Sequence, residues 1–253
     1  MKISRSTLKV KQPSCGGEKC GATDGGCLIC GAGLVYGGSA MRTCHVCGRK
    51  KPSNALCENG HFVCDDCHAY GAYAPVVSFL KNSGETDPLK LFAGAVKISS
   101  VHMHGPEHHF IVPMVLLTAY RNCGGKLNYD AAMSEAHKRG GQIPGGTCGY
   151  WGVCGAAAGA GVYASIITCS TPLNRAVWAL PQKLTAEILE RIASYGGPRC
   201  CKRTGITAII TAAEFTTERL GVTMKTERAK CVHFGRNREC IKDSCPYYPR
   251  ESV

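Results

Sequence analysis

The residues with the clearest chemistry in this chain are eight candidate metal ligands near its start, which come in four pairs. Two pairs belong to Cys-x-x-Cys-Gly knuckles (CLICG and CHVCG), and the tight turn of such a knuckle lets both sulfurs reach one ion. Four pairs supply the ligands of two tetrahedral sites, so we expect two bound zinc ions. The pairs are Cys27/Cys30, Cys44/Cys47, Cys57/His61 and Cys64/Cys67.

The segment from Cys44 to Cys67, above all the run CENGHFVCDDC, resembles the core of a RING finger. The resemblance implies interleaving, in which the first and third pairs share one ion and the second and fourth share the other. The additional pair precedes the His segment here instead of following it, which favours zinc that staples the fold over ubiquitin-ligase activity. One zinc would be bound by Cys27, Cys30, Cys57 and His61, and the other by Cys44, Cys47, Cys64 and Cys67. Cys15 and Cys20 have no assigned partner, and are redox-active or join a third site in this interpretation.

Three segments of the second half, taken in order, also carry residues suited to chemistry. The first is SSVHMHGP (residues 99–106), the second runs from GGTC (145–148) to CGAAAGAG (154–161), and the third is PRCCKRT (198–204). Together they resemble the α domain of the iron–sulfur L-serine dehydratases and, more loosely, the L-cysteine desulfidases. The resemblance spans roughly residues 98–221, about half of the chain.

This resemblance implies a 4Fe-4S cluster. Cys148 or Cys154 would enter as one ligand and Cys200, or its neighbour Cys201, as another. Because residues 170–199 contain no cysteine, the tail must complete the cluster, and a proline follows its last cysteine as is common beside clusters. A catalytic cubane uses three protein ligands and leaves one iron open. The tail candidates are Cys231, Cys240 and Cys245; a third zinc site at Cys231, His233, Cys240 and Cys245 is the less favoured alternative.

The resemblance also implies a reaction, a lyase or sulfur-transfer step on a small β-hydroxy or β-thiol amino-acid-like substrate. The open iron would hold the carboxylate and the leaving group. His102 and His104 are candidate bases because imidazole titrates near neutral pH. Ser99 and Ser100 would bind the substrate carboxylate, and Lys202 and Arg203 could add positive charge.

Simpler interpretations exist for the same residues. Histidines 102, 104, 108 and 109 are a candidate mononuclear metal site, although capping or stacking is the preferred interpretation of His108 and His109. An exposed carboxylate is expected at Glu107, and buried small side chains without a role at Cys123 and Cys169. The alternative for the whole chain is a non-catalytic zinc-binding module that docks protein or nucleic acid.

Composition limits the partners. The chain has 30 Lys and Arg against 18 Asp and Glu, a formal charge of +12, which metal-bound thiolates would reduce to roughly +8. The basic residues are scattered apart from Lys2, Arg5, Lys9 and Lys11, so a solvated basic surface is favoured over a nucleic-acid site. With 18 cysteines, no secretory signal and no apolar stretch long enough for a membrane, we expect a cytoplasmic metalloprotein. The oligomeric state is left open.

The elements that must position these residues are mainly helices. We expect a basic tail (1–14), a Cys-rich two-zinc module (15–70), a connector (71–97) and an α-helical domain (98–253). Asp87 and Pro88 should start one helix and Thr185 should cap another that ends at Gly196. Further helices are predicted over 111–120, 130–139, 155–167 and 206–220.

Overall fold

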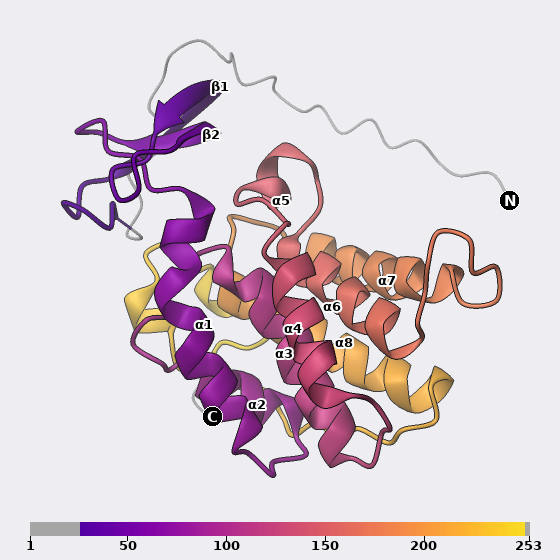
Figure 1. Ribbon diagram of the computed structural model, residues 1–253. Coiled ribbons are helices and arrows are strands. Elements are labelled where there is room, and N and C mark those ends of the chain that lie inside the picture. The colour runs from indigo at the N-terminus through magenta and orange to yellow at the C-terminus, as the bar shows by residue number, and fades with distance from the viewer. Residues whose placement is uncertain (1–25, 251–253) are drawn as a thin grey trace, which may run out of the picture.

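A computed structural model describes residues 26–250 of the chain (Figure 1). Within that range the fold is mainly α-helical, with one two-stranded sheet close to its start. The predicted fold class is therefore confirmed. The predicted basic tail (1–14) and Cys15 and Cys20 lie outside the described residues.

The sheet is a hairpin of β1 (Leu34–Thr43) and β2 (Lys50–Cys57), paired antiparallel from Leu34 opposite Cys57 to Thr43 opposite Lys50. The second knuckle, CHVCG, forms its loop, and Gly48 takes a φ of 71° that favours glycine in this tight turn. An irregularity between Tyr36 and Ala40 bends the first strand. The hairpin thus brings knuckle ligands to both of its ends.

Helix α1 (Asp65–Lys81) begins inside the metal module, because Cys64 is its N-cap and Cys67 lies in its first turn. Asp65 and Asp66 place negative charge at the positive helix start. The same helix then runs on into the helical part of the molecule (Figure 1). The predicted boundary at residue 70 therefore falls within a continuous helix, and not at a linker.

The core is built around α3 (Glu107–Asn122), whose residues from 107 to 119 are all buried. Helices α2 (Pro88–Ala95), α4 (Tyr129–Gly140), α6 (Gly155–Ile167) and α8 (Cys201–Arg219) all pack against it. The close approach of α6 needs a residue without a side chain, since a Cβ at Gly159 would lie 2.6 Å from the carbonyl oxygen of His109. The small-residue helix over 155–167 has the bounds that the sequence predicted.

The predicted starts of two other helices had different outcomes. Asp87 caps α2 and accepts a hydrogen bond from the backbone N–H of Leu89 at 2.8 Å, as predicted. The predicted cap at Thr185 was wrong, because α7 (Ala179–Tyr195) starts six residues earlier. The hydroxyl of Thr185 donates to the carbonyl of Pro181 at 2.8 Å. Threonine often caps helices, but here it lies inside the helix.

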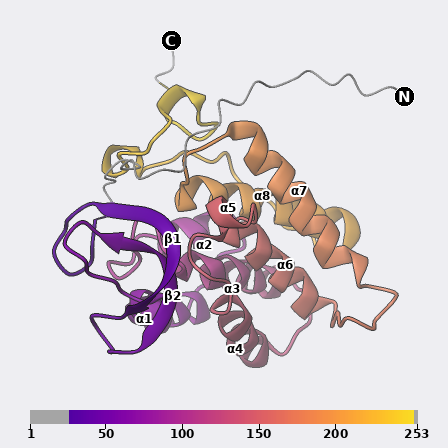
Figure 2. The ribbon, with the colours of Figure 1, turned by 90° about the horizontal axis from the view of Figure 1, so that it is seen from above.

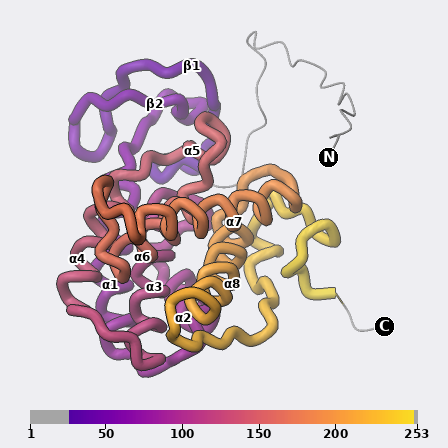
Figure 3. The backbone as a smooth tube through the Cα atoms, turned by 90° about the vertical axis from the view of Figure 1, so that its right-hand side faces the viewer, coloured from indigo at the N-terminus to yellow at the C-terminus, as the bar shows by residue number. Residues whose placement is uncertain are grey.

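Between the end of α8 and residue 250, the regular elements are short 3-10 turns at Phe234–Arg236 and Lys242–Ser244. This C-terminal segment, yellow in Figure 3, lies alongside α8. The backbone N–H of Cys231 donates to the carbonyl of Tyr247 at 2.7 Å, and the Tyr247 hydroxyl lies 2.9 Å from that of Thr207 in α8. These contacts hold the tail cysteines against the start of α8. Over residues 26–250, none of the helices combines the length and the apolar character needed to cross a membrane.

Candidate metal centres

The two N-terminal sets of ligands are assembled in the interleaved order. In each set the four ligand atoms lie within 4.8 Å of one another, so each could hold a metal ion. Contacts across the pairs are close, with Cys30 Sγ 3.9 Å from Cys57 Sγ and 3.2 Å from His61 Nδ1. Cys47 and Cys64 are separated by 3.8 Å in the other set. The sets are Cys27, Cys30, Cys57 and His61, and Cys44, Cys47, Cys64 and Cys67.

The pKa values of the thiols in these sets are shifted in opposite directions. Hydrogen bonds from the backbone at Ala32 and from Asn59 lower the pKa of Cys30 to about 6. The Arg49 side chain likewise lowers the pKa of Cys47 to about 6, whereas burial and the neighbouring thiols raise the pKa of Cys67 to about 12. Four thiolates gathered at this spacing repel one another, and a bound dication removes that conflict.

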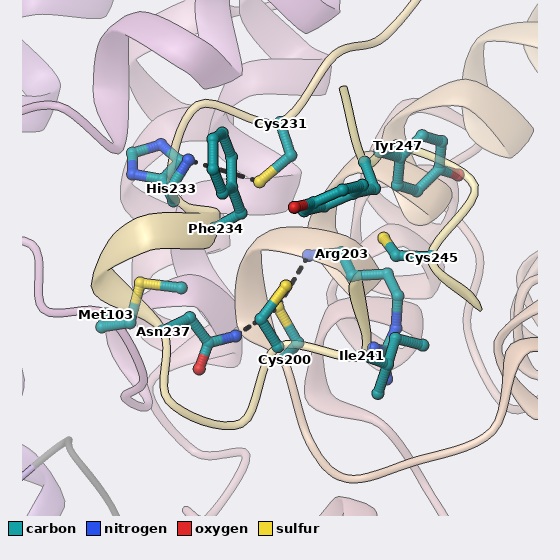
Figure 4. Close-up of a pocket in the computed structure, with 12 residues that line it drawn as sticks. Met103, Cys200, Arg203, Cys231, His233, Phe234, Asn237, Ile241, Cys245 and Tyr247 are labelled. Carbon is teal, nitrogen blue, oxygen red and sulfur yellow. Dashed lines mark hydrogen bonds between the residues drawn. The ribbon is translucent and has the colours of Figure 1, made fainter. Parts of the chain in front are cut away.

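A third group of cysteines, which we call the tail set, lines a small closed cavity beside α8. Its members come from distant positions, and Figure 4 shows Cys200, Cys231 and Cys245 with their side chains directed into one space. The cavity measures about 10 Å³. That is room for about one water-sized sphere, so any larger group would require the surrounding side chains to move apart. The tail set is Cys200, Cys231, Cys240 and Cys245.

The sulfurs of the tail set are spaced more widely than those of the N-terminal sets. No three sulfurs of the tail set lie within 4.8 Å of one another. The alternative group with His233 does not meet this distance either. Three of the sulfurs accept backbone N–H groups: Cys200 from Arg203 at 3.4 Å, Cys231 from His233 at 3.3 Å and Cys240 from Lys242 at 3.4 Å. The sulfurs of the tail set therefore do not form a single-ion grouping, although three of them accept hydrogen bonds from the backbone.

A separate group, which we call the cavity set, consists of Cys148, Cys154 and Cys201. They line a cavity of about 1500 Å³ between the hairpin and the helical part. Neighbouring residues Cys200 and Cys201 thus belong to different groups. Cys148 and Cys154, which the sequence interpretation joined to the tail cysteines, lie instead with Cys201 in this large cavity.

Residues of the hairpin and of α5 (Thr147–Tyr150) line the large cavity. The view from above shows the hairpin and α5 near one another (Figure 2). Tyr36 of β1 lies under the guanidinium of Arg199, 5.3 Å from the ring centre. Burial raises the pKa of Tyr36. The metal module therefore forms part of the wall of this cavity, to which it also contributes Cys27 and Cys64 of the N-terminal sets.

Two buried polar atoms in the wall of the large cavity have no hydrogen-bond partner in the described structure. They are Nδ1 of His104 and the hydroxyl of Thr147, whose residues are 7% and 4% exposed. His104 is otherwise held by Asn237, whose Oδ1 lies 3.2 Å from Nε2. Burial, with Arg199 nearby, lowers the pKa of His104, so it is neutral near pH 7. Unpaired buried polar atoms are costly unless a ligand satisfies them.

The other predicted catalytic residues lie elsewhere. Ser99 and Ser100 line neither cavity, and nor does His102. Nδ1 of His102 is 3.3 Å from a carboxylate oxygen of Glu107, which is 0% exposed. The expectation of an exposed Glu107 was therefore wrong. Cys169 was also expected to be buried and is exposed, while Cys123 is half-buried.

Glu107 is the centre of a buried polar network next to the last ligand of the metal module. Its other oxygen lies 3.1 Å from Nδ1 of His68, the residue that follows Cys67. Although burial opposes ionisation, the hydrogen bonds from His102 and His68 hold the pKa of Glu107 well below its usual range. The ligand atoms of His68, His102 and Glu107 lie within 4.8 Å of one another.

Lys202 extends this network from α8. Its ammonium donates to the carbonyl of His102 and to Nε2 of His108, both at 2.8 Å. His108 in turn contacts the carbonyl of Gly105 through Nδ1 at 3.1 Å, so its two partners define a neutral tautomer. Burial lowers the pKa of Lys202 to about 8. His109 bonds the carbonyl of Ile143 at 2.9 Å, and no three of the four histidines at 102, 104, 108 and 109 form one metal-binding group.

The sequence interpretation missed His68, Asn237 and Arg199. A signal existed for His68, which immediately follows a metal ligand on a predicted turn. Arg199 stands between a proline and two cysteines, which marks it as a neighbour of a sulfur site. Asn237 lies in a segment without helix or strand periodicity, so the sequence does not predict which way its side chain points.

Comparisons with known proteins give one family. Residues 76–248, more than half of the chain, match the model described as "Family of unknown function (DUF5714)". The matched residues contain the tail set and the cavity set, whereas the ligands of the N-terminal sets precede them. Neither the search of curated proteins nor the search of solved structures gave a match.

Proposed function

The chain belongs to this family of unknown function, and from the geometry of its cysteines we propose that it is an iron–sulfur protein. The tail set holds a 4Fe-4S cluster, and the two N-terminal sets hold zinc. A metal-binding protein is the coarser statement that the ligand sets already support. The choice of iron–sulfur over a third zinc site rests on the tail set.

The observation that carries the proposal is the convergence of four cysteines on one small cavity, with no three of their sulfurs within 4.8 Å of one another. The same chain supplies the comparison, because sulfurs of the N-terminal sets approach to 3.8 and 3.9 Å. A tetrahedral zinc ion needs that close packing, since each Zn–S bond is about 2.3 Å. A cubane holds its four thiolates further apart.

The charges around the tail set also suit a cluster. Burial and nearby thiols raise the pKa of Cys231, and burial raises that of Cys200, so the free thiols resist ionisation. Asn237 donates to Cys200 Sγ at 3.5 Å, and the guanidinium of Arg203 lies close enough to favour its thiolate. These donors and cations offset the negative charge that a cluster with four thiolates carries.

Four thiolates occupy all four irons, so this cluster has no open position for a substrate. We therefore propose that it carries electrons. The apolar side chains of Val232 and Phe234 beside it are 63% and 40% exposed, which gives a redox partner a surface to approach. A lyase or sulfur-transfer reaction on an amino-acid-like substrate, as expected from the sequence, needs a different centre with an open position.

The test is anaerobic purification of the full chain, followed by metal analysis and spectroscopy. We expect about two zinc ions per chain and an absorbance band near roughly 400 nm that dithionite bleaches reversibly. Cys245→Ser should lower the iron content by about four ions per chain. Cys123→Ser, outside every ligand set, is the matched control and should change neither. A colourless protein with about three zinc ions would overturn the proposal.

A further inference from the structure

We propose that the cavity set, Cys148, Cys154 and Cys201, holds a second iron–sulfur cluster with one iron left open to a small anionic ligand. This inference deepens the proposed function, and rests on it only in taking iron–sulfur clusters as the metal groups of this chain. It assigns the large cavity a role separate from that of the tail set.

The three thiols reach the cavity from three separate elements. Cys148 lies in α5, Cys154 is the N-cap of α6 and Cys201 is the first residue of α8. The last two stand at the starts of helices of 13 and 19 residues, where the helix dipole favours a thiolate. Their spacing again exceeds that of a single-ion site, because the three sulfurs do not lie within 4.8 Å of one another.

The wall of the cavity also includes Cys27, Cys64 and Cys200, but Cys27 and Cys64 belong to the N-terminal ligand sets. Cys123 and Cys169 line neither cavity. Cys200 touches both, but its sulfur accepts from Arg203 N–H and from Asn237, and is directed into the small cavity (Figure 4). A cubane with three protein thiolates has one iron without a protein sulfur ligand, and that iron would face a large cavity.

The unpaired polar atoms of the wall are an independent indication of a ligand here. Nδ1 of His104 and the hydroxyl of Thr147 are buried, line the cavity and have no hydrogen-bond partner in the described structure. Thr147 directly precedes Cys148. A buried polar group without a partner costs about 1–3 kcal/mol, so two of them beside three thiols indicate that a polar molecule completes this site.

The charges of the wall select an anion. Arg199 lines the same cavity as the three thiols and brings a guanidinium into its wall. Its Nε is 3.6 Å from Glu239, and a guanidinium has five N–H donors, so donors are left for a ligand. A neutral His104 donates its Nε2–H to Asn237, so its unpaired Nδ1 is an acceptor and bonds a ligand that also carries a proton. The volume of about 1500 Å³ lets such a ligand reach the open iron without rearrangement of the hairpin.

Two adjacent substitutions separate the centres. Cys200→Ser removes a ligand of the tail set, and Cys201→Ser removes one of the cavity set. We expect about eight irons per chain in the unaltered protein after anaerobic reconstitution, and about four in each variant. Where Cys201→Ser fails to fold by circular dichroism, Cys148→Ser replaces it, because Cys148 is exposed.

The open iron is tested with ¹³C-labelled cyanide, a small anionic iron ligand. Electron-nuclear double resonance should show ¹³C coupling in the unaltered protein and in Cys200→Ser, but not in Cys201→Ser. Arg199→Gln should weaken binding about tenfold or more, because it removes a charged donor. The matched control Arg191→Gln, which alters an exposed residue that lines neither cavity, should leave binding unchanged.

The outcomes distinguish the two proposals. An iron content unchanged in Cys201→Ser, or ¹³C coupling that survives in that variant, would overturn the second cluster. An iron content unchanged in Cys200→Ser, together with a loss in Cys201→Ser, would leave the second cluster standing and overturn the electron-carrying cluster of the tail set.

Discussion

His104 Nε2 lies 3.2 Å from Oδ1 of Asn237, although 133 positions separate the two residues. The amide nitrogen of the same Asn237 donates to Cys200 Sγ at 3.5 Å. One asparagine therefore joins a sulfur of the tail set to a histidine in the wall of the large cavity. The hydrogen-bonded path from the tail set to this histidine is a single side chain long.

Replacement of Asn237 by alanine should alter the tail cluster before it alters the cavity. The change removes an N–H donor from Cys200 and strands His104, so we expect a lower reduction potential, by tens of mV, and a loss of about 1–3 kcal/mol of stability. Potentiometric titration followed by electron paramagnetic resonance measures the first effect. Asn82→Ala, on the exposed end of α1, is the control. An unchanged potential would contradict the hydrogen bond's role.

Glu107→Gln should destabilise the fold strongly. The buried carboxylate accepts from the His102 backbone at 2.9 Å and faces two imidazoles, and the amide cannot replace those charged contacts. Loss of one partner in a buried ionic group costs about 3–5 kcal/mol. Urea unfolding of the metal-loaded protein is the measurement. Glu135→Gln, which breaks an exposed pair with Arg139, should cost less than about 1 kcal/mol; equal losses would argue against the network.

Gly159→Ala and Gly71→Ala should have opposite effects, although both glycines lie in helices. A Cβ at Gly159 would meet the His109 carbonyl oxygen at 2.6 Å, whereas at Gly71 it would meet only the Ser100 side chain at 3.6 Å. We expect a loss of about 1–3 kcal/mol from overpacking at Gly159. At Gly71 we expect a gain of about 0.5–1 kcal/mol from the alanine's better helix propensity. Thermal unfolding of both variants checks the pair, and a stable Gly159→Ala would show that α3 and α6 can separate freely.

The stability of the protein should fall in mild acid, in part through His109. Burial lowers the pKa of His109 in the folded protein below the value of the unfolded chain. Below about pH 6.5 the unfolded chain therefore binds more protons, and the free energy of unfolding decreases as the pH falls.

His109→Asn removes this titration, so its unfolding free energy should change less between about pH 7 and pH 5 than that of the unaltered protein. Urea unfolding at a series of pH values is the measurement. The ionisation of Glu107 contributes only at lower pH, because its pKa lies below its usual range. Parallel pH profiles for variant and parent would show that His109 does not contribute.

Local pattern was enough to predict much of the fold. The helix over 155–167 and the Asp87 cap follow from composition and capping chemistry within a few residues of sequence. The interleaved grouping of the N-terminal ligands was implied by the resemblance to a RING finger, and all of these ligands lie within about forty residues of one another. Thr185 shows the limit, since a hydroxyl that caps helices can equally bond a carbonyl inside one.

The division of the later cysteines could not be predicted in the same way. Spacing does not say that Cys154 lies with Cys201 and that Cys200 lies with Cys231, because the tail returns to α8 through backbone contacts such as Cys231 N–H to Tyr247. Glu107 was misjudged for a related reason. Carboxylates are usually exposed, and its imidazole partners come from elements that only the tertiary fold brings together.

Successive residues of a helix point about 100° apart around its axis, and Cys200 and Cys201 stand at the start of α8. If α8 rotated about its long axis, both sulfurs would move together. Each would then leave the cavity that it lines. Loss of a single residue ahead of α8 would shift Cys201 into the position of Cys200 and Lys202 into that of Cys201. Cys200 and Cys201 thus couple the geometry of the small cavity to that of the large cavity through a single peptide bond.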